Sequence, residues 1–382
     1  MTQANYDWRA EFPVNDECMY LNHAAVAPWP ESARKAVMQF ASENVALGAS
    51  HYPEWLKTEI RLKQQLQQLI DAPNDSVALV KNTSEALSFV AMGLDWQAGD
   101  VVVISDQEFP SNRIVWEALK ARGVRVIEVA LPWQDPESLL LQAIAEKPRL
   151  VSVSAVQYAS GLRLDINRLG AACRQHGCLF CVDAIQAVGA QSFSVHDCQC
   201  DFAMADGHKW LLGPEGLGFF YVRPQVMEQL QIQEYGWHMV EDAGNYDNHD
   251  WQPAASARRF ECGSPNMLAA HALSASCDLL LKVGMTRVEA AIAERIDYLQ
   301  QGLEQLNATL LNPCLKERRS GILTFHFIGC DSQALHKMLM QSGVICANRG
   351  GGIRFSPHFH TPQEVLDDAL EAVAGIVDIV QR

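Results

Sequence analysis

The sequence lacks a long apolar run and an excess of positive charge. No stretch of the 382 residues approaches the ~18 consecutive apolar residues that a membrane-spanning helix needs. Thirty lysines and arginines stand against 45 aspartates and glutamates, which gives a formal net charge of −15 at pH 7. Binding to nucleic acid or to an anionic membrane needs a cationic surface. The sequence therefore predicts a protein that acts on small molecules, with no nucleic-acid or membrane partner.

A compact cysteine framework and an export signal are also missing. The eleven cysteines are scattered along the chain, as is typical of reduced thiols in a core, so no disulfides are expected. Cys173, Cys178 and Cys181 have an iron–sulfur spacing, but they fall on different predicted elements, so we expect no metal site. The first twelve residues lack the basic start and apolar segment of a secretory signal. These absences predict a cytoplasmic protein.

The length indicates two domains, because single cores stop growing near ~250 to 300 residues. From about residue 75 to 225, short apolar runs alternate with helical stretches, which predicts an α/β fold with a mainly parallel sheet. Seven strands are expected, beginning near residues 77, 101, 124, 150, 178, 201 and 216. The irregular segment 231–257 marks a boundary. We predict a large domain over 16–255 and a smaller α+β domain over 256–382, joined by residues 1–15.

Polar residues follow two of these strands, at the sheet edge where ligands bind in open α/β folds. Thr83 and Ser84 stand at the start of a helix, whose free backbone N–H groups favour an anion. Either residue could instead be an ordinary helix cap. Asp183 ends an apolar strand, where a carboxylate needs a cationic or donor partner such as a protonated pyridine nitrogen. Alternatively, this aspartate caps a helix or lies at the protein surface.

Lys209 follows Asp206, Gly207 and His208 and precedes an apolar run, so its amine is expected in a partly desolvated place. Burial lowers the pKa of a lysine and frees its amine to attack an aldehyde. The alternative is a lysine that reaches solvent from the start of a helix. The pattern makes Lys209 a candidate nucleophile.

Several motifs along the chain fit one family. An Asp-x-x-Gln pair in VDAIQAVGA is followed by His-Lys and a Gly-Pro-x-Gly-x-Gly turn in DFAMADGHKWLLGPEGLGFFYVRP. YLNHAAVAP near the start and RRFECGSPN at residue 259 also fit. Together they resemble the class V aminotransferase family of fold-type I enzymes, which includes cysteine desulfurases, isopenicillin N epimerase and kynureninase. The resemblance implies pyridoxal 5'-phosphate (PLP) as cofactor and an amino acid as substrate.

The resemblance also implies a role for each matching residue around the cofactor ring. Lys209 corresponds to the Schiff-base lysine, Asp183 to the partner of the pyridinium nitrogen, and His208 to the histidine beside the lysine; these three are the expected catalytic residues. Gln186 corresponds to the residue that contacts the phenolic oxygen. Desulfurases stack a histidine on the ring, whereas Phe109, followed by proline, is closer to kynureninases. Phe109 is our candidate for this position, with a simple core role as the alternative.

Four residues are expected near the cofactor phosphate. Thr83 and Ser84 correspond to the phosphate ligands of the family. Ser264 corresponds to a residue that in relatives reaches the phosphate of the neighbouring subunit, which implies a homodimer with active sites at the interface. Asp206 stands where most relatives have serine. An acid is disfavoured beside a phosphate dianion unless it is protonated or turned away, which leaves its role open.

An amino-acid substrate needs a cation for its carboxylate, and arginine offers bidentate geometry. Arg354, in a strand-like run, corresponds to the carboxylate-binding arginine of the family, and Arg349 is a second candidate. A solvated arginine at a sheet edge is the alternative for Arg354. Asn22, His23 and His51 are expected by analogy to line the substrate side, or else to be caps or surface residues.

The sequence leaves the reaction open. Desulfurases carry a nucleophilic cysteine between the two arginine positions, where this chain has only residues 350–353, Gly-Gly-Gly-Ile. Cys346 lies earlier, in a strand-like run, so persulfide transfer is disfavoured. Transamination and β-elimination by a C–S lyase, both through an external aldimine, fit the sequence equally well. The alternatives are a kynureninase-like hydrolase, a desulfurase-like enzyme without the usual cysteine, and a non-enzymatic PLP-fold binding protein.

Overall fold

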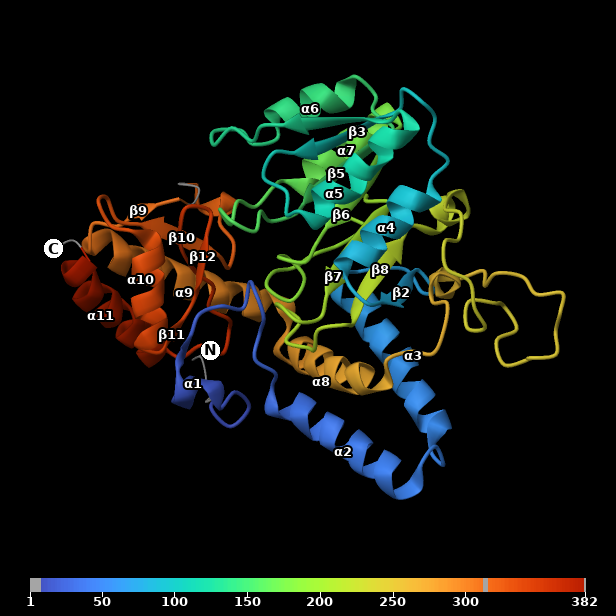
Figure 1. Cartoon of the computed structure of the whole chain (residues 1–382), viewed down its shortest axis with the longest axis horizontal. Coiled ribbons are helices and arrows are strands. Elements are labelled where there is room, and N and C mark those ends of the chain that lie inside the picture. The colour runs from blue at the N-terminus through green and yellow to red at the C-terminus, as the bar shows by residue number, and fades with distance from the viewer. Residues whose placement is uncertain (1–7, 312–314, 381–382) are drawn as a thin grey trace.

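The computed structural model describes residues 8–311 and 315–380 and contains the predicted seven-stranded sheet. Its strands are β2 (Val77–Val80), β3 (Val101–Ser105), β4 (Arg125–Val129), β5 (Leu150–Ser154), β6 (Leu179–Asp183), β7 (Phe202–Asp206) and β8 (Gly218–Val222). They lie in the order β2-β8-β7-β6-β5-β3-β4, and only β8 runs antiparallel to its neighbours. The carboxyl ends of the other six strands therefore meet at one edge (Figure 1).

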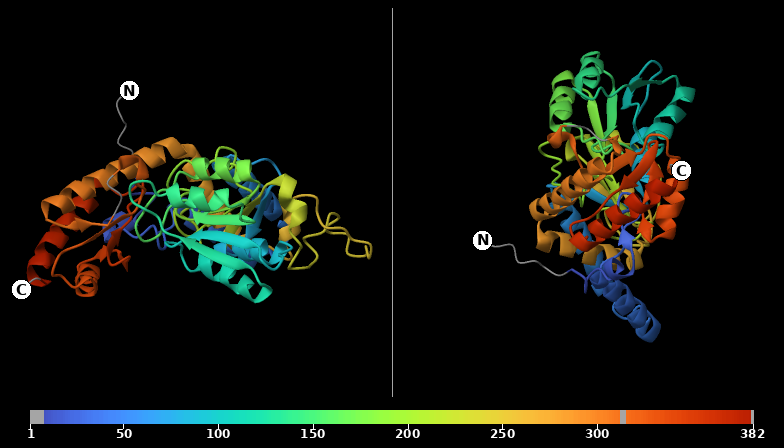
Figure 2. Two further views of the ribbon diagram at one scale, coloured as in Figure 1. Left: turned by 90° about the horizontal axis from the view of Figure 1, so that it is seen from above. Right: turned by 90° about the vertical axis from the view of Figure 1, so that its left-hand side faces the viewer.

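Alternating side chains of each strand face two cores. Val102 and Ile104 of β3 belong to one apolar cluster and Val103 to the other, because successive side chains of a strand point to opposite faces. One face packs on α4 (Thr83–Gly93) and α5 (Ser111–Glu117). The other packs on α3 (Tyr52–Leu69), α6 (Ser138–Ala145) and α7 (Ile166–His176). Both faces are thus covered by helices, as a mainly parallel sheet requires (Figure 2).

A smaller antiparallel sheet lies beside the C-terminus. It has the order β12-β13-β10-β9, built from β9 (Thr309–Leu310), β10 (Leu323–His326), β12 (Ala347–Arg349) and β13 (Gly352–Phe355). Its helices are α9 (Met285–Gln305), α10 (Ser332–Gln341) and α11 (Gln363–Val380). This mixture matches the expected α+β pattern and confirms the predicted fold class.

The start of the chain lies against this C-terminal unit. α1 (Val14–Glu17) leads into β1 (Met19–Tyr20), which pairs in parallel with β11 (Val344–Ile345). β1 contacts α11, and β11 contacts α10, beside which it lies in Figure 1. Residues 1–7 of the expected 1–15 connection lie outside the described residues, and the division at residue 255 stays a prediction.

Two long helices meet at a sharp bend after the irregular segment 231–257. α8 (Met267–Val283) packs against α2 (Glu31–Leu47) and α3, and Gly284, with φ of +85°, turns the chain into α9. In the described part of the chain no single helix is long and apolar enough to cross a membrane. Only α8 and α9 taken together pass that test, and they are bent by 84°.

Candidate active site

One cavity of about 330 Å³ opens at the carboxyl edge of the large sheet and reaches β13 of the small one. It gathers ten of the residues predicted for the site. These are Thr83, Ser84, Phe109, Asp183, Gln186, Asp206, His208, Lys209, Arg349 and Arg354. Residues separated by up to 271 positions in the chain thus share one space, because β2, β6 and β7 all end at this edge.

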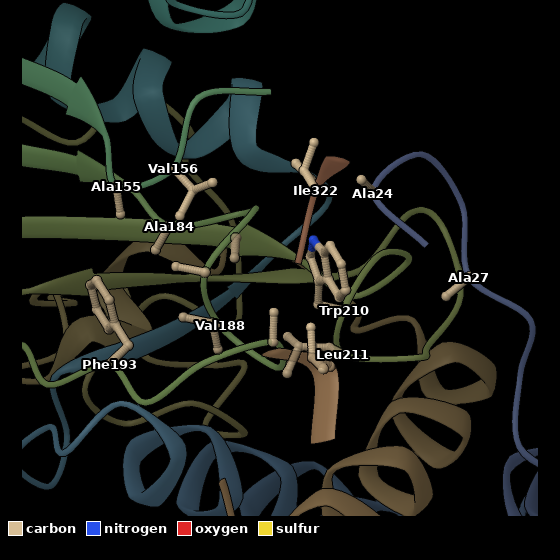
Figure 3. Close-up of a cluster of buried hydrophobic side chains, with 14 of the residues drawn as sticks. Ala24, Ala27, Ala155, Val156, Ala184, Val188, Phe193, Trp210, Leu211 and Ile322 are labelled. Atoms are coloured by element: carbon tan, nitrogen blue, oxygen red, sulfur yellow. The ribbon is translucent and has the colours of Figure 1, made fainter. Parts of the chain in front are cut away.

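Lys209 lies in the turn that follows β7, with its amine toward the cavity. Burial lowers the pKa of this amine to about 8, although the nearby Asp183 carboxylate opposes the shift. The next residue, Trp210, is fully buried, and Figure 3 shows it packed between Leu211 and Ile322. This apolar anchor holds the lysine in place, and the lowered pKa leaves part of the amine neutral near pH 8, as a nucleophile requires.

Asp183 and Gln186 occupy the end of β6 and the turn after it. Asp183 is 2% exposed, and burial raises the pKa of its carboxyl to about 7, while the Ile185 N–H donates to Oδ1 at 3.0 Å. A cationic partner would restore its ionised form. Gln186 donates from Nε2 to the Ala24 carbonyl at 3.0 Å and accepts at Oε1 from Trp210 Nε1 at 2.7 Å. The carboxylate is therefore available to a ligand, and the amide is held by the chain on both sides.

The N-terminus of α4 forms one wall of the cavity, and its cap is Asn82. Asn82 Oδ1 accepts from the Glu85 N–H at 2.9 Å, so the alternative that Thr83 or Ser84 caps this helix is wrong. The Thr83 hydroxyl is buried and forms no well-aligned hydrogen bond among the described residues, although it lies near enough to the Asp206 carboxylate to lower the pKa of that acid. Ser84 Oγ donates to Ser111 Oγ at 2.8 Å. Asn82 thereby keeps the Thr83 and Ser84 hydroxyls out of the helix cap, at a helix start that favours an anion.

His208 and Asp206 lie between this helix and Lys209. Asp206 Oδ1 accepts from the Thr83 N–H at 2.7 Å, and Oδ2 lies 3.5 Å from His208 Nδ1. Burial raises the pKa of Asp206 to about 6. It lowers the pKa of His208 to about 4, so this imidazole is neutral at pH 7. His208 Nδ1 is buried without a hydrogen-bond partner among the described side chains and main chain.

Arg354 brings a buried cation to the opposite wall. It is 2% exposed in β13, so the alternative of a solvated arginine at a sheet edge is wrong. Its Nη1 donates to the Tyr158 carbonyl at 2.7 Å, and burial lowers the pKa of the guanidinium to about 10. Within residues 8–311 and 315–380 no carboxylate lies within 4 Å of it, and its Nε is buried and unpaired. Arg349, exposed at the end of β12, lines the same wall.

Four of the predicted residues do not line the cavity of the single chain. His23 is fully buried, with Nδ1 donating to the Ser356 carbonyl at 2.9 Å, and Asn22 bridges to Ser356 beside it. His51 precedes α3, half exposed, with Nδ1 3.2 Å from a Glu43 carboxylate oxygen. Ser264 lies in the loop before α8. Their expected roles stay predictions.

The structure adds two residues that the motifs did not reveal. Tyr158 lines the cavity and packs edge-on against Phe109, with ring centroids 5.2 Å apart. Phe109 is 41% exposed and 5.6 Å from the Lys209 amine, so a simple core role is excluded. Glu108 is buried and accepts from Asn112 Nδ2 at 2.8 Å and the Ser154 N–H at 3.0 Å, which fixes the loop that carries Phe109. In the sequence, the position of Tyr158 shortly after the end of a strand is the feature that could have identified it as a site residue.

The two arginines are joined by a tight hairpin. Arg349 pairs with Gly352, and the turn between them consists of Gly350 and Gly351, both with positive φ. A two-residue turn of this kind requires glycine and projects no side chain. Cys346 is 3% exposed, and burial raises its pKa to about 12. Neither the hairpin nor Cys346 offers a mobile thiolate to this cavity.

Comparison with known proteins finds a matching family model and similar proteins. The sequence model for Aminotransferase class-V matches residues 19–365. A probable cysteine desulfurase of Methanothermobacter thermautotrophicus is 29% identical over 97% of this chain and 98% of its own length. The isopenicillin N epimerase of Streptomyces clavuligerus is 27% identical, covering 97% of this chain and 99% of the relative.

Solved structures share the fold. An apo cysteine desulfurase from Thermococcus onnurineus NA1 superposes with a TM-score of 0.88 at 22% identity, covering 99% of both chains. A cystine C-S lyase bound to its product cysteine persulfide superposes with a TM-score of 0.88, also at 22% identity, covering 95% of this chain and 99% of that one.

Proposed function

The chain belongs to the aminotransferase class-V family, and from this premise we propose that it cleaves or transfers the β-substituent or amino group of a small amino acid at the cavity around Lys209. The predictions of a PLP-dependent enzyme and of this family are confirmed. One observation carries the proposal: the Lys209 amine, the Asp183 carboxylate and the Arg354 guanidinium face a single cavity. A binding protein has no need of this combination of nucleophile, acid and buried cation.

The residues fit the cofactor that the family uses. We propose that Lys209 bonds to the PLP aldehyde, that Asp183 faces its ring nitrogen, and that Thr83 and Ser84 hold its phosphate. The unpaired Thr83 hydroxyl and the raised pKa of Asp183 support this placement, since each lacks the partner that PLP would bring. Gln186 and His208 complete the walls around the ring. When bound, PLP supplies an electron sink for the pair left at the substrate Cα.

The chain itself orients the substrate and handles the proton. Arg354 is a buried cation, and no carboxylate of the described residues lies within 4 Å of it, so we propose that it binds the substrate carboxylate in bidentate fashion. Lys209 is the candidate base that removes the proton from Cα, because its amine is partly neutral near pH 8. Phe109 and Tyr158 limit the access of water from the open side.

For the reaction we favour β-elimination at a carbon–sulfur bond without a cysteine nucleophile. The two-glycine hairpin between Arg349 and Gly352 has no side chain to accept sulfur. A cystine C-S lyase is among the structures with the same fold. Transamination is the second candidate, since a lysine base serves both reactions equally. A kynureninase-like hydrolase is a third candidate, because Phe109 faces the Lys209 amine where desulfurases place a histidine.

We further propose a cytoplasmic homodimer. Ser264 lies outside the cavity of its own chain, in the loop before α8, and the family resemblance assigns it to the phosphate of the neighbouring subunit. A protein that sediments as a monomer while fully loaded with PLP would remove the support for this part of the proposal.

The decisive experiment is cofactor trapping followed by a substrate panel. Borohydride reduction of the PLP-loaded protein should fix the cofactor mass on the peptide that contains Lys209, and Lys209→Ala should show neither this mass nor turnover while keeping its circular dichroism. Release of sulfide and pyruvate from cysteine or of cysteine persulfide and pyruvate from cystine, amino transfer to 2-oxo acids, and anthranilate release from kynurenine then separate the three reactions. A protein that takes up no PLP, or turnover that is unchanged in Lys209→Ala, would refute the proposal.

A further inference from the structure

Asp206 places a negative charge at the position where the site should receive an anion. Its side chain is 11% exposed and lines the cavity with Thr83 and Ser84. Oδ1 accepts the Thr83 N–H at 2.7 Å, so the carboxylate is directed at the N-terminus of α4 and not away from it. A phosphate at this helix start and the ionised carboxylate would therefore share the same backbone donor region. Two anions in one poorly solvated place repel each other strongly.

The groups that face Asp206 do not neutralise this charge. From β6 it faces the acid Asp183, and from the loop before β8 the acid Glu215. His208 is the imidazole beside it, at 3.5 Å, and is neutral because its pKa is lowered to about 4. Among the described residues no lysine or arginine nitrogen lies within 4 Å of the Asp206 carboxylate.

Lys209 is the cation whose charge favours the ionised form of Asp206. Its amine must lose its proton before it can bond to an aldehyde. This favourable charge is thus lost at the step that brings the phosphate in. Burial already raises the pKa of Asp206 to about 6, and an arriving dianion raises it further.

We propose that Asp206 couples PLP binding to the uptake of one proton: the phosphate settles beside Thr83 and Ser84 only when the Asp206 carboxyl is protonated. The protonated carboxyl can still accept the Thr83 N–H at one oxygen, and its O–H can donate to a phosphate oxygen. PLP affinity should therefore weaken as the pH rises above the pKa of Asp206. This inference rests on the proposed PLP site and adds a regulatory property to it.

The test uses Asp206→Asn, which has the same shape as the protonated residue: its oxygen can accept the Thr83 N–H and its NH₂ can donate. PLP dissociation constants are measured for the wild-type protein and the variant between about pH 5.5 and about pH 8.5, from the absorbance of the bound cofactor. The ratio of wild-type to variant constants should be near one at the acid end and rise by about tenfold per pH unit above the pKa of Asp206, as expected for one linked proton. Ionisation of the phosphate affects both proteins and cancels in the ratio. The Asp206 charge also raises the pKa of Lys209, so the ionisation of Lys209 differs between the two proteins, and the ratio for pyridoxal measures that contribution.

Two controls isolate the phosphate and the position. Pyridoxal, which lacks the phosphate, should give a ratio that varies with pH only through Lys209, without the tenfold rise per pH unit. Glu215→Gln removes an exposed acid that raises the pKa of Asp206 but does not line the cavity, so its ratio to wild type should show at most a small step and no such rise. Calorimetry of wild-type PLP binding in two buffers of different ionisation enthalpy counts the protons directly and does not depend on the folding of any variant.

Each outcome is decisive. A flat ratio near one means that Asp206 does not sense the phosphate, and a ratio that is high at every pH means that it stays ionised in the complex; either result overturns the inference. Failure of both proteins to bind PLP would instead refute the proposed function, so the two failures are distinguishable.

Discussion

At the residue scale, the cavity is defined by buried charges that lack partners in the chain. Asp183 and Arg354 are each 2% exposed, and neither has an opposite charge within 4 Å among the described residues. A buried unpaired charge is costly, so a folded chain retains one chiefly where a ligand supplies the counter-charge. The two signs also lie on different walls, the acid on the large sheet and the cation on the small one. This separation suits a substrate held between them.

Arg354→Ala should raise the KM for an amino-acid substrate by the equivalent of about 2 to 5 kcal/mol, because it removes the partner of a buried carboxylate. The effect on kcat should be smaller. Steady-state kinetics on the substrate found in the panel measure both. Arg354→Lys keeps the charge but lacks the planar guanidinium that binds a carboxylate in bidentate fashion, so it should recover only part of the loss. An unaltered KM would move the carboxylate site to Arg349.

Asp183→Asn should separate stability from activity. The pKa of Asp183 is raised from 3.8 to about 7 in the folded protein, so the folded state holds a proton that the unfolded state has lost between those values. In the cofactor-free protein, the contribution of Asp183 to stability is therefore complete below pH 3.8 and is lost as the pH rises to 7. At about pH 8 the asparagine variant should be more stable by on the order of 2 to 4 kcal/mol. Urea unfolding measures this, and kcat should fall sharply; a variant that is less stable at that pH would contradict the buried, uncompensated charge.

At the scale of elements, α4 shows how one capping residue prepares a site. Asn82 accepts the Glu85 N–H, so neither the Thr83 nor the Ser84 hydroxyl is needed as the helix cap. The sequence pattern offered three polar residues in a row, and local rules allow any of them to cap. The extended backbone at Asn82 and the approach of Asp206 to the Thr83 N–H decide which one does.

Asn82→Ala should destabilise the protein by about 1 kcal/mol, the usual effect of a lost N-cap. It should also weaken PLP binding, because Thr83 and Ser84 are then recruited to cover the helix end. Chemical unfolding and cofactor titration are the measurements. Asn82→Asp retains the cap and should keep the stability, whereas equal losses in both variants would assign the effect to something other than capping.

At the scale of the whole molecule, three buried histidines join the start of the chain to its C-terminal unit. His23 Nδ1 must carry a proton because it faces the Ser356 carbonyl, so its Nε2 accepts from His360 Nε2 at 3.1 Å. His358 accepts the Phe359 N–H at Nδ1, and its Nε2 donates to the Trp210 carbonyl at 3.1 Å, beside Lys209. Every ring in this set is neutral, and any added proton breaks a hydrogen bond.

Acid should therefore weaken the contribution of this histidine cluster to stability. Burial lowers the pKa of His23 from 6.5 to about 4, and those of His358 and His360 shift in the same direction. The unfolded chain takes up protons first, so stability is full above pH 6.5 and falls toward pH 4, by about 3 kcal/mol for His23 alone. Asp183, with its raised pKa, acts in the opposite direction between pH 7 and pH 5, so the His23 contribution is read from the difference between the unfolding free energies of wild type and His23→Gln at each pH. This difference should shrink from pH 7 to pH 5; a difference that does not change with pH would contradict the assignment.

The sequence by itself determined the main elements and the family. All seven strands and the helices between them could be predicted, because strand periodicity and strand ends are local properties. The expected roles of Lys209 and Asp183 came from the resemblance of the motifs to the family, and the reaction stayed open. Tertiary structure decided what meets across distance: that Tyr158 and Glu108 support Phe109, that His23 is locked in a buried cluster outside the cavity, and that the Asp206 carboxylate turns toward Thr83. Those contacts join residues far apart in the chain, and no local preference specifies them, since they follow only from how the two sheets and the N-terminal segment pack together.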